Sequence, residues 1–188
     1  MNSKIFVFVA VAVFLAVPVL AGDGLAETSQ PRLPETALLD ILEAVSTKTG
    51  KTFAINKYVS PNVVTGQLGG KNMTYDGLLL VLRNNELAAY TSNNIVNIVP
   101  VRAVRQAPLP LLLTDSDTAS DQEWVTRLVR VEHTDAHMFV PILRPLLPQQ
   151  GHMVAHMESN TLMIVARFGN VQRIVALIRE LDRKAASR

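Results

Sequence analysis

The hydrophobic pattern of the last sixty residues predicts one compact unit. A polar turn at 158–160 leads into an apolar run, Leu162 to Ala166, as expected for a buried strand. Gly169 and Asn170 are predicted to end this strand, with Asn170 capping a new helix. The apolar positions of that helix recur at helical spacing: Val171, Ile174, Val175, Ile178 and Leu181. The order predicted for 124–183 is strand, helix, strand, strand, helix.

The first half of this unit carries a helix that contains prolines. The apolar run Trp124 to Val131 predicts a strand, and His152 to Met157 predicts the next one. Thr134 and Asp135 are expected to cap the helix between them. Its expected core face carries Phe139, Ile142, Leu143 and Leu146. Pro141 and Pro145 lie inside this helix, so we expect it to be kinked or partly broken.

A second α+β module is predicted nearer the amino terminus. A helix is expected from Glu35 to Thr49, after Pro34 and before Gly50. Its core positions are Leu38, Ile41, Leu42 and Val45. Short strands are expected at Thr52 to Asn56 and Val63 to Leu68.

The rest of this module predicts a helix and a hairpin. Thr74 is expected to cap a helix with an apolar face formed by Leu78, Val81 and Leu82. The β-rich runs Leu87 to Thr91 and Ile95 to Val99 flank Ser92-Asn93-Asn94. Because asparagine tolerates positive φ, this stretch predicts a hairpin turn.

Residues 103–123 differ in composition and are predicted to link the modules. Two prolines are followed by the acidic stretch Thr114 to Glu123, which has no core-forming side chain. Leu109 and Leu111 to Leu113 are the exception and are expected to dock on a domain. The predicted division is a first module at 27–102, this linker, and a second module at 124–183. We expect the modules to fold independently, with limited proteolysis cutting first between Ala107 and Glu123.

The first residues predict export. Lys4 precedes an apolar stretch of about 16 residues, Ile5 to Leu20, and small residues follow, so Met1 to Ala21 is interpreted as a cleaved signal peptide. A second possible cut follows Ala26. A retained membrane anchor is the alternative, but a spanning helix needs roughly 20 residues. The predicted location is the periplasm.

Composition limits the chemistry. The chain has no cysteine and a formal net charge of +2. Disulfides and thiol catalysis are thereby excluded, and a charge so close to balance does not favour nucleic acid as a partner. Small apolar cores must therefore hold the exported modules together.

The histidines and glycines do not predict a catalytic, metal or cofactor site. His133 and His137 would share a helix face only if both lay on one helix, and His133 precedes the expected cap. His152 and His156 would lie about 13 Å apart along a strand. Gly66 to Gly70 lacks the spacing of a phosphate loop. Trp124 is interpreted as a core or linker-docking residue. Partner-binding residues are left unknown.

Several segments, taken in order, resemble one family. In the first module they are Ala37 to Asn56, Val64 to Leu68, Met73 to Leu82 and Leu87 to Pro100. In the second module they are Arg127 to Val131, Val140 to Leu146, Asn160 to Val165 and Ile178 to Asp182. These segments resemble the first two periplasmic domains of type II secretion secretins, the outer-membrane channels of bacterial secretion systems. The strand order of the second module also resembles KH-like folds, although Pro148 to Gly151 does not supply the GXXG loop of a nucleic-acid binder.

The resemblance implies a non-enzymatic periplasmic component of protein secretion without cofactors. Its implied partners are inner-membrane components of a type II secretion system and secretin subunits in a homo-oligomeric ring, with no nucleic acid and no small-molecule substrate. In the family, the first domain contacts the inner-membrane component and the second stacks into a ring. The chain ends at Arg188, before the pore domain that the family pattern would place next, so we expect it not to form a channel alone. The alternative is a signalling input domain. Such a domain precedes TonB-dependent receptors, where it binds an anti-sigma regulator.

Overall fold

A short strand precedes the first helix, where the sequence predicted the helix itself. The computed structural model describes residues 34–68 and 73–186. In it, β1 (Glu35–Ala37) pairs antiparallel with β3 (Asn62–Val64), with Glu35 opposite Val64. The predicted start of the helix at Glu35 is therefore wrong, because residues 35–37 extend to complete this ladder. Beyond β3, Gly66–Leu68 form a 3₁₀ turn, so the strand expected to reach Leu68 is shorter than predicted.

Two helices carry the core of the first module. α1 (Leu38–Thr49) buries its four predicted core positions and ends at Gly50, whose φ of 69° is left-handed. α2 (Tyr75–Asn84) begins after Thr74, whose hydroxyl accepts a hydrogen bond from the amide of Gly77 at 3.1 Å. Both predicted helix boundaries, the glycine end and the threonine cap, are confirmed.

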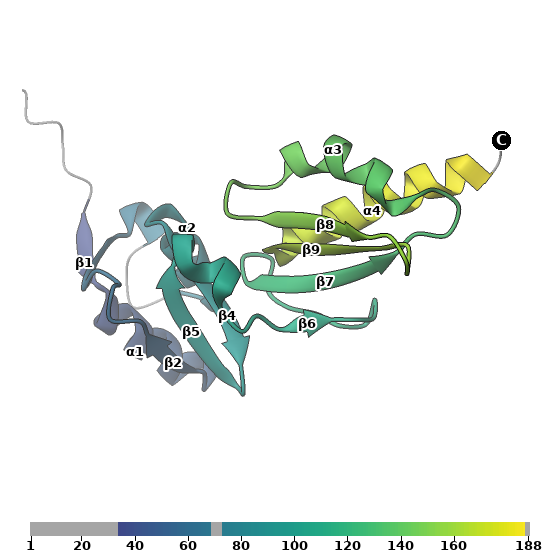
Figure 1. Cartoon of the computed structure of the whole chain (residues 1–188). Helices are drawn as coiled ribbons and strands as arrows, with labels where there is room; N and C mark the ends of the chain where they lie inside the picture. Colours follow the sequence, from purple (N-terminus) through teal and green to yellow (C-terminus); the bar gives the residue numbers. More distant parts are fainter. Residues whose placement is uncertain (1–33, 69–72, 187–188) are drawn as a thin grey trace, which may run out of the picture. The chain divides into compact units, whose positions relative to one another are not determined.

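A three-stranded sheet completes this module (Figure 1). Its order is β2-β5-β4, with β2 (Thr52–Ile55) parallel to β5 (Ile95–Pro100). β4 (Leu87–Ser92) is antiparallel to β5, and the turn between them places Asn93 and Asn94 at φ values of 50° and 63°. The predicted hairpin is confirmed. One face of β4 and β5 packs on the two helices through Leu87, Ala89, Val96 and Ile98.

The second module has the predicted order of strands and helices. β7 (Trp124–Arg130) is followed by α3 (Phe139–Leu143), β8 (His152–His156), β9 (Thr161–Arg167) and α4 (Phe168–Ala186). The sheet order is β6-β7-β9-β8, and β9 is antiparallel to both of its neighbours. Residues of α3, α4 and the sheet share one apolar core. The predicted α+β class is confirmed, while the finer likeness to KH-like folds stays a prediction.

Part of the expected linker belongs to this second sheet. β6 (Leu111–Leu112) pairs parallel with β7, with Leu111 opposite Thr126. Leu112 is buried in the core of the second module, as the expected docking of this leucine run implies. Before it, residues 101–106 form a 3₁₀ segment in which Val104 is buried.

The proline-bearing helix is broken as predicted, although two of its expected core residues are exposed. α3 is five residues long and lies between the 3₁₀ turns Ala136–Met138 and Arg144–Leu146. Phe139 and Leu143 are buried, whereas Ile142 is 60% exposed and Leu146 is 43% exposed. The breaks rotate these two side chains away from the core.

The side chain that caps the start of this segment is not one of the two that the sequence predicted. Neither Thr134 nor Asp135 caps it through its side chain. Instead, Asn160 Oδ1 accepts the amide of Ala136 at 2.7 Å, from the turn between β8 and β9.

α4 starts earlier than predicted and needs no asparagine cap. β9 runs directly into the helix, so Gly169 and Asn170 lie inside its first turn. The amides of Phe168 and Gly169 donate to the carbonyl oxygens of Glu123 and Asp121, at 2.8 and 2.9 Å. Near the other end Leu181 is 42% exposed, contrary to prediction, and Asp182 is buried in its place.

Candidate interaction site at the junction of the two modules

A cluster of buried side chains joins the two modules. Both modules lie within one compact unit. Trp124, at the start of β7, is fully buried in this cluster and packs against the face of β4 and β5 that the first core leaves free. The buried members of the cluster are Ala88, Tyr90, Val99, Val104, Trp124 and Val165. Trp124 is therefore a core residue, one of the two roles that the sequence predicted for it.

Glu123 fixes the polar edge of this cluster. Its carboxylate accepts hydrogen bonds from the hydroxyl of Tyr75 on α2 and from the hydroxyl of Thr91 on β4, the latter at 3.2 Å. Only 5% of Glu123 is exposed. The sequence placed it at the end of a solvated acidic linker, which is wrong for this residue. Burial, and then the hydrogen bond to Glu123, raise the pKa of Tyr75, so its hydroxyl remains a donor at neutral pH.

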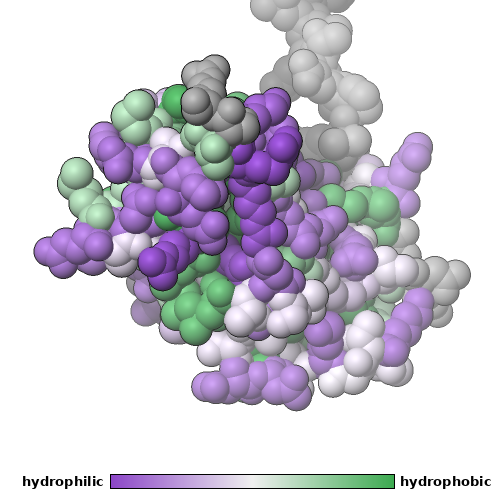
Figure 2. Space-filling model, turned by 90° about the vertical axis from the view of Figure 1, so that its right-hand side faces the viewer, coloured by the Kyte–Doolittle hydropathy of each residue, from purple (hydrophilic) through white to green (hydrophobic). Residues whose placement is uncertain are grey.

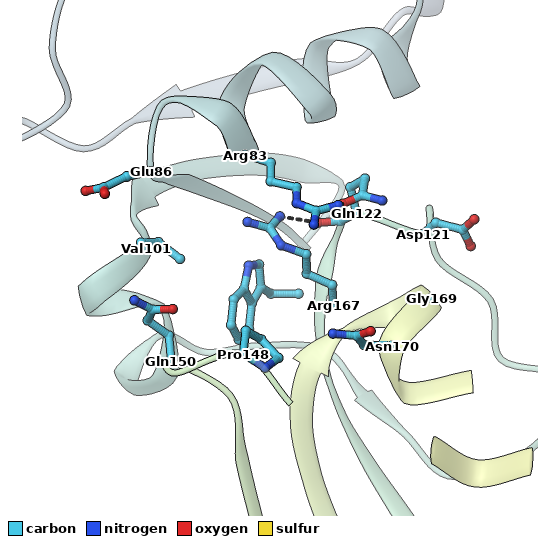
Figure 3. A pocket seen from close by; sticks show the side chains of 11 residues that line it. Arg83, Glu86, Val101, Asp121, Gln122, Pro148, Gln150, Arg167, Gly169 and Asn170 are labelled. Carbon is cyan, nitrogen blue, oxygen red and sulfur yellow. Dashed lines mark hydrogen bonds between the residues drawn. The ribbon is translucent and has the colours of Figure 1, made fainter. Parts of the chain in front are cut away.

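A cavity of about 400 Å³ opens beside Trp124 and is lined by both modules (Figure 3). Arg83, Glu86 and Val101 come from the first module, Asp121 and Gln122 from the segment between the modules, and the remaining lining residues from the second module. Figure 3 shows the guanidinium groups of Arg83 and Arg167 close to one another beside Gln122. Arg83 donates to the side-chain oxygen of Gln122 at 3.3 Å, and Arg167 donates to its backbone oxygen at 3.0 Å.

Arg167 brings a positive charge to this cavity. Its guanidinium lies over the ring of Trp124, 5.4 Å from the ring centroid, which is a cation–π contact. Burial, and then the positive charge of Arg83, lower the pKa of Arg167 to about 10, so it is still a cation at neutral pH. Within residues 34–68 and 73–186, neither arginine forms an ion pair with a carboxylate.

The histidines do not gather at this site. His133 lies in the loop after β7, His137 lies in the 3₁₀ turn before α3, and His152 and His156 lie at opposite ends of β8. His156 Nδ1 is 2.9 Å from the hydroxyl of Ser159. In the part of the chain that the structure describes, no group of three or more His, Cys, Asp or Glu side chains is placed to hold a metal ion.

Several sequence predictions lie outside the described residues. They are the signal peptide at Met1 to Ala21, the possible cut after Ala26 and the glycine pair Gly69-Gly70. Of the glycine cluster, Gly66 is described and adopts a left-handed φ of 56°. For the described ranges, no helix is both long and apolar enough to cross a bilayer.

Little in the amino-acid sequence predicts the junction residues. Arg83 and Arg167 each follow an apolar run, a position where a charged residue ordinarily faces solvent. Tyr75 lies directly after a helix cap. The one available signal is that Glu123 and Trp124 adjoin where the acidic segment meets a strand, which places a carboxylate beside a large aromatic residue.

Exposed apolar side chains are distributed over both modules. In the first module, Leu39 and Tyr58 are 66% and 69% exposed, and in the second, Ile142 and Met157 are 60% and 72% exposed. Figure 2 shows one face of the molecule, on which hydrophobic side chains form separate patches among hydrophilic ones. Such scattered residues are normal on a surface and do not by themselves define a binding site.

Comparison with known proteins assigns the chain to a class. Residues 126–187 match the family described as the bacterial type II/III secretion system short domain. That match covers β7 to α4, the unit whose strand and helix order the sequence predicted. Residues 126–187 therefore belong to this family, and the chain is homologous to bacterial type II secretins over most of its length.

The similarity to individual secretins extends through both modules. The chain is 27% identical over 156 residues to the secretin XcpQ of Pseudomonas aeruginosa, which covers 82% of this chain and 23% of XcpQ. It is 26% identical over 186 residues to the secretin GspD 2 of Escherichia coli, which covers 96% of this chain and 27% of that protein. The chain thus spans about a quarter of the length of the curated relatives that it matches.

A solved structure shares the fold. A chain of the Klebsiella pneumoniae type II secretion system outer membrane complex, which contains PulD, PulS and the PulC HR domain, superposes with a TM-score of 0.61 at 21% identity. The superposition covers 81% of this chain and 26% of that one. The predicted resemblance to secretins is confirmed, and these matches do not favour the alternative of a receptor signalling domain.

Proposed function

We propose that this protein is a non-enzymatic periplasmic component of a type II secretion system. It would form part of the periplasmic vestibule of a secretin and engage inner-membrane secretion components or neighbouring secretin subunits. The observation that carries the proposal is the homology to type II secretins through both modules in their order along the chain. The family match over 126–187 supports it independently for the second module.

The implied partners follow from the relatives. The Klebsiella complex contains PulD together with PulS and the PulC HR domain. By analogy, the first module of this chain would contact an inner-membrane component, and the second module would contact another secretin subunit. Small sheets favour both kinds of contact, because their edge strands offer unpaired amides and carbonyls to a partner.

The predicted division into modules at 27–102 and 124–183 belongs to this proposal. Its support is that each module has its own apolar core, with the helices and sheet of one module packed together. The junction cluster around Trp124 would then set the angle between the modules.

Site-specific photo-crosslinking in cells that carry a type II secretion system tests this proposal. A photoreactive residue would replace, one at a time, the exposed first-module residues Leu39 and Tyr58 and the exposed second-module residues Ile142 and Met157. The two sets are matched in exposure and apolar character. We expect the first set to capture an inner-membrane component and the second to capture a secretin subunit, each identified by mass spectrometry.

A buried control position and the identity of the captured partners show which results would contradict the proposed function. The buried position Val45 should capture no partner, because its side chain is fully inside the first core. If purification of the whole chain, with and without crosslinking, recovers neither class of partner, the secretion role is wrong. Recovery of an anti-sigma regulator in their place would support the signalling alternative.

A further inference from the structure

Trp124 lines the junction cavity, and its buried indole N–H has no hydrogen-bond partner among the described residues. Trp124 is fully buried, and among the described residues its Nε1 is the one buried side-chain nitrogen or oxygen that lacks a hydrogen bond. Buried tryptophan N–H groups ordinarily find an acceptor, because a buried donor left unpaired has lost its hydrogen bond to water without replacement. Because Trp124 borders a cavity, a ligand bound in that cavity would supply the missing acceptor.

The other donors around the cavity indicate the charge of that ligand. Arg83 and Arg167 line the cavity, and within the described part of the chain their side-chain hydrogen bonds go only to the neutral oxygens of Gln122. The side-chain amides of Gln150 and Asn170 also line it. An anion would satisfy both guanidinium groups and relieve their mutual repulsion, since guanidinium matches carboxylates and phosphates with paired donors.

The carboxylates near the cavity limit the negative charge of the ligand to about one unit. Glu86 and Asp121 also line it, and Figure 3 shows both carboxylates directed away from the two arginines. Two guanidinium groups with two carboxylates nearby suit a monoanion better than a doubly charged phosphate. We propose that the junction cavity binds a single carboxylate group, with the Trp124 indole and the guanidinium groups of Arg83 and Arg167 as donors.

Two sources of a carboxylate fit this chemistry: the acidic side chain of a protein partner and a free organic acid. In either case the ligand would bridge the two modules, because Arg83 belongs to the first module and Trp124 and Arg167 belong to the second. Binding would therefore stiffen the junction. This inference stands on the cavity alone and does not depend on the secretion role.

The single tryptophan of the chain makes the test direct. The whole ¹⁵N-labelled chain gives one indole N–H resonance, that of Trp124. Titration with sodium acetate at pH 7 and constant ionic strength should move this resonance downfield and saturate, as a new hydrogen bond forms. Acetamide has nearly the same shape without the charge and should produce no saturable shift. Inorganic phosphate should bind more weakly than acetate.

Variants locate the binding. Arg83 is exposed and Arg83→Gln should leave the fold intact while weakening acetate binding about fivefold, the loss expected for one exposed charge-assisted contact. Arg167→Gln should weaken it more. Arg130→Gln, an exposed arginine of the second module that does not line the cavity, should change nothing. A well-dispersed spectrum confirms folding in each case.

A pair of capped tripeptides separates the two sources. If acetyl-Gly-Glu-Gly-amide shifts the indole resonance at lower concentration than acetate and its glutamine counterpart does not, the ligand is an acidic side chain. If acetate is the tighter ligand, it is a free organic acid. The proposal is overturned if no carboxylate gives a saturable shift, if acetamide matches acetate, or if Arg83→Gln binds like the Arg130→Gln control.

Discussion

Each module uses one polar side chain from a helix to hold a distant segment, but the two side chains differ in charge. In the first module Asn85, directly after α2, holds β3. Its side-chain oxygen accepts the amide of Val64, and its nitrogen donates to the carbonyl oxygens of Val64 and Val81, all at 2.8 Å. A neutral amide can do this because it both donates and accepts.

In the second module the buried Asp182 of α4 holds the loop after β7. Its carboxylate accepts the backbone amides of Glu132, His133 and Thr134, at 2.9, 3.0 and 2.8 Å. A carboxylate only accepts hydrogen bonds, so it suits a segment that presents three free amides in a row. Charge-assisted bonds are stronger than neutral ones, but they depend on the carboxylate remaining ionised. At neutral pH the Asp182 anchor should therefore stabilise its module more than the Asn85 anchor stabilises the first module. In acid the Asp182 anchor should lose this advantage.

The largest expected effect is the loss of the Asp182 carboxylate. Asp182→Ala leaves three amides without their acceptor in a buried setting, and we expect the free energy of unfolding to fall by about 3 kcal/mol. Urea denaturation followed by circular dichroism measures it. Asp182→Asn is the matched control: it keeps one accepting oxygen and should lose less. Equal losses in the two variants would show that charge is not what stabilises this loop.

A smaller loss is expected at Asn85. Asn85→Ala removes three neutral hydrogen bonds, two of which hold β3, and we expect the free energy of unfolding to fall by about 2 kcal/mol. Hydrogen exchange of the Val64 amide should accelerate more than exchange in β9. Should Asn85→Ala prove as damaging as Asp182→Ala, the comparison between neutral and charged anchors would fail.

Acidification should reduce the difference between wild-type protein and Asp182→Asn. Burial acts to raise the pKa of Asp182, but the hydrogen bonds from the amides of 132–134 together lower it below its usual value. A carboxyl group whose folded-state pKa is depressed contributes stability above its unfolded pKa of about 3.9, and this contribution disappears as pH falls through the folded pKa. We therefore expect the gap in unfolding free energy to be full at pH 7 and to close below pH 4. A gap that stayed constant with pH would contradict this assignment.

The smallest effect on stability is expected at Asp115, in the segment between the modules. Its carboxylate lies 2.6 Å from Arg127 Nη2 and 2.5 Å from Arg179 Nη2, which ties the segment to β7 and α4. Because the carboxylate is exposed, Asp115→Ala should leave the urea midpoint unchanged within error. It should instead accelerate cleavage of residues 113–121 in limited proteolysis. Ser116→Ala is the matched control, and equal cleavage rates in the two variants would show that the ion pairs do not restrain the segment.

The two modules also differed in how much of their structure was predictable. In the second module, the strand and helix order and four of the five core positions of α4 followed from periodicity. Leu181 and Asp182 did not, because periodicity assigns burial by residue type and cannot register that three free amides lie opposite one helix position. In the first module β1 was missed, since a three-residue strand after a proline has no pattern of its own and forms only through pairing with β3.

The sequence by itself determined the elements whose signal is local: the Thr74 cap, the Gly50 helix end, the Asn93-Asn94 turn and the apolar faces of the longer helices. It also determined the resemblance to secretins, which rests on the order of those elements. Only the tertiary structure decided that Glu123 is buried against Tyr75, that Leu111 and Leu112 add a strand to the second sheet, and that Trp124, Arg83 and Arg167 line one cavity. These features depend on contacts between residues far apart in the chain, and the free energy of such contacts leaves no periodic pattern in the sequence.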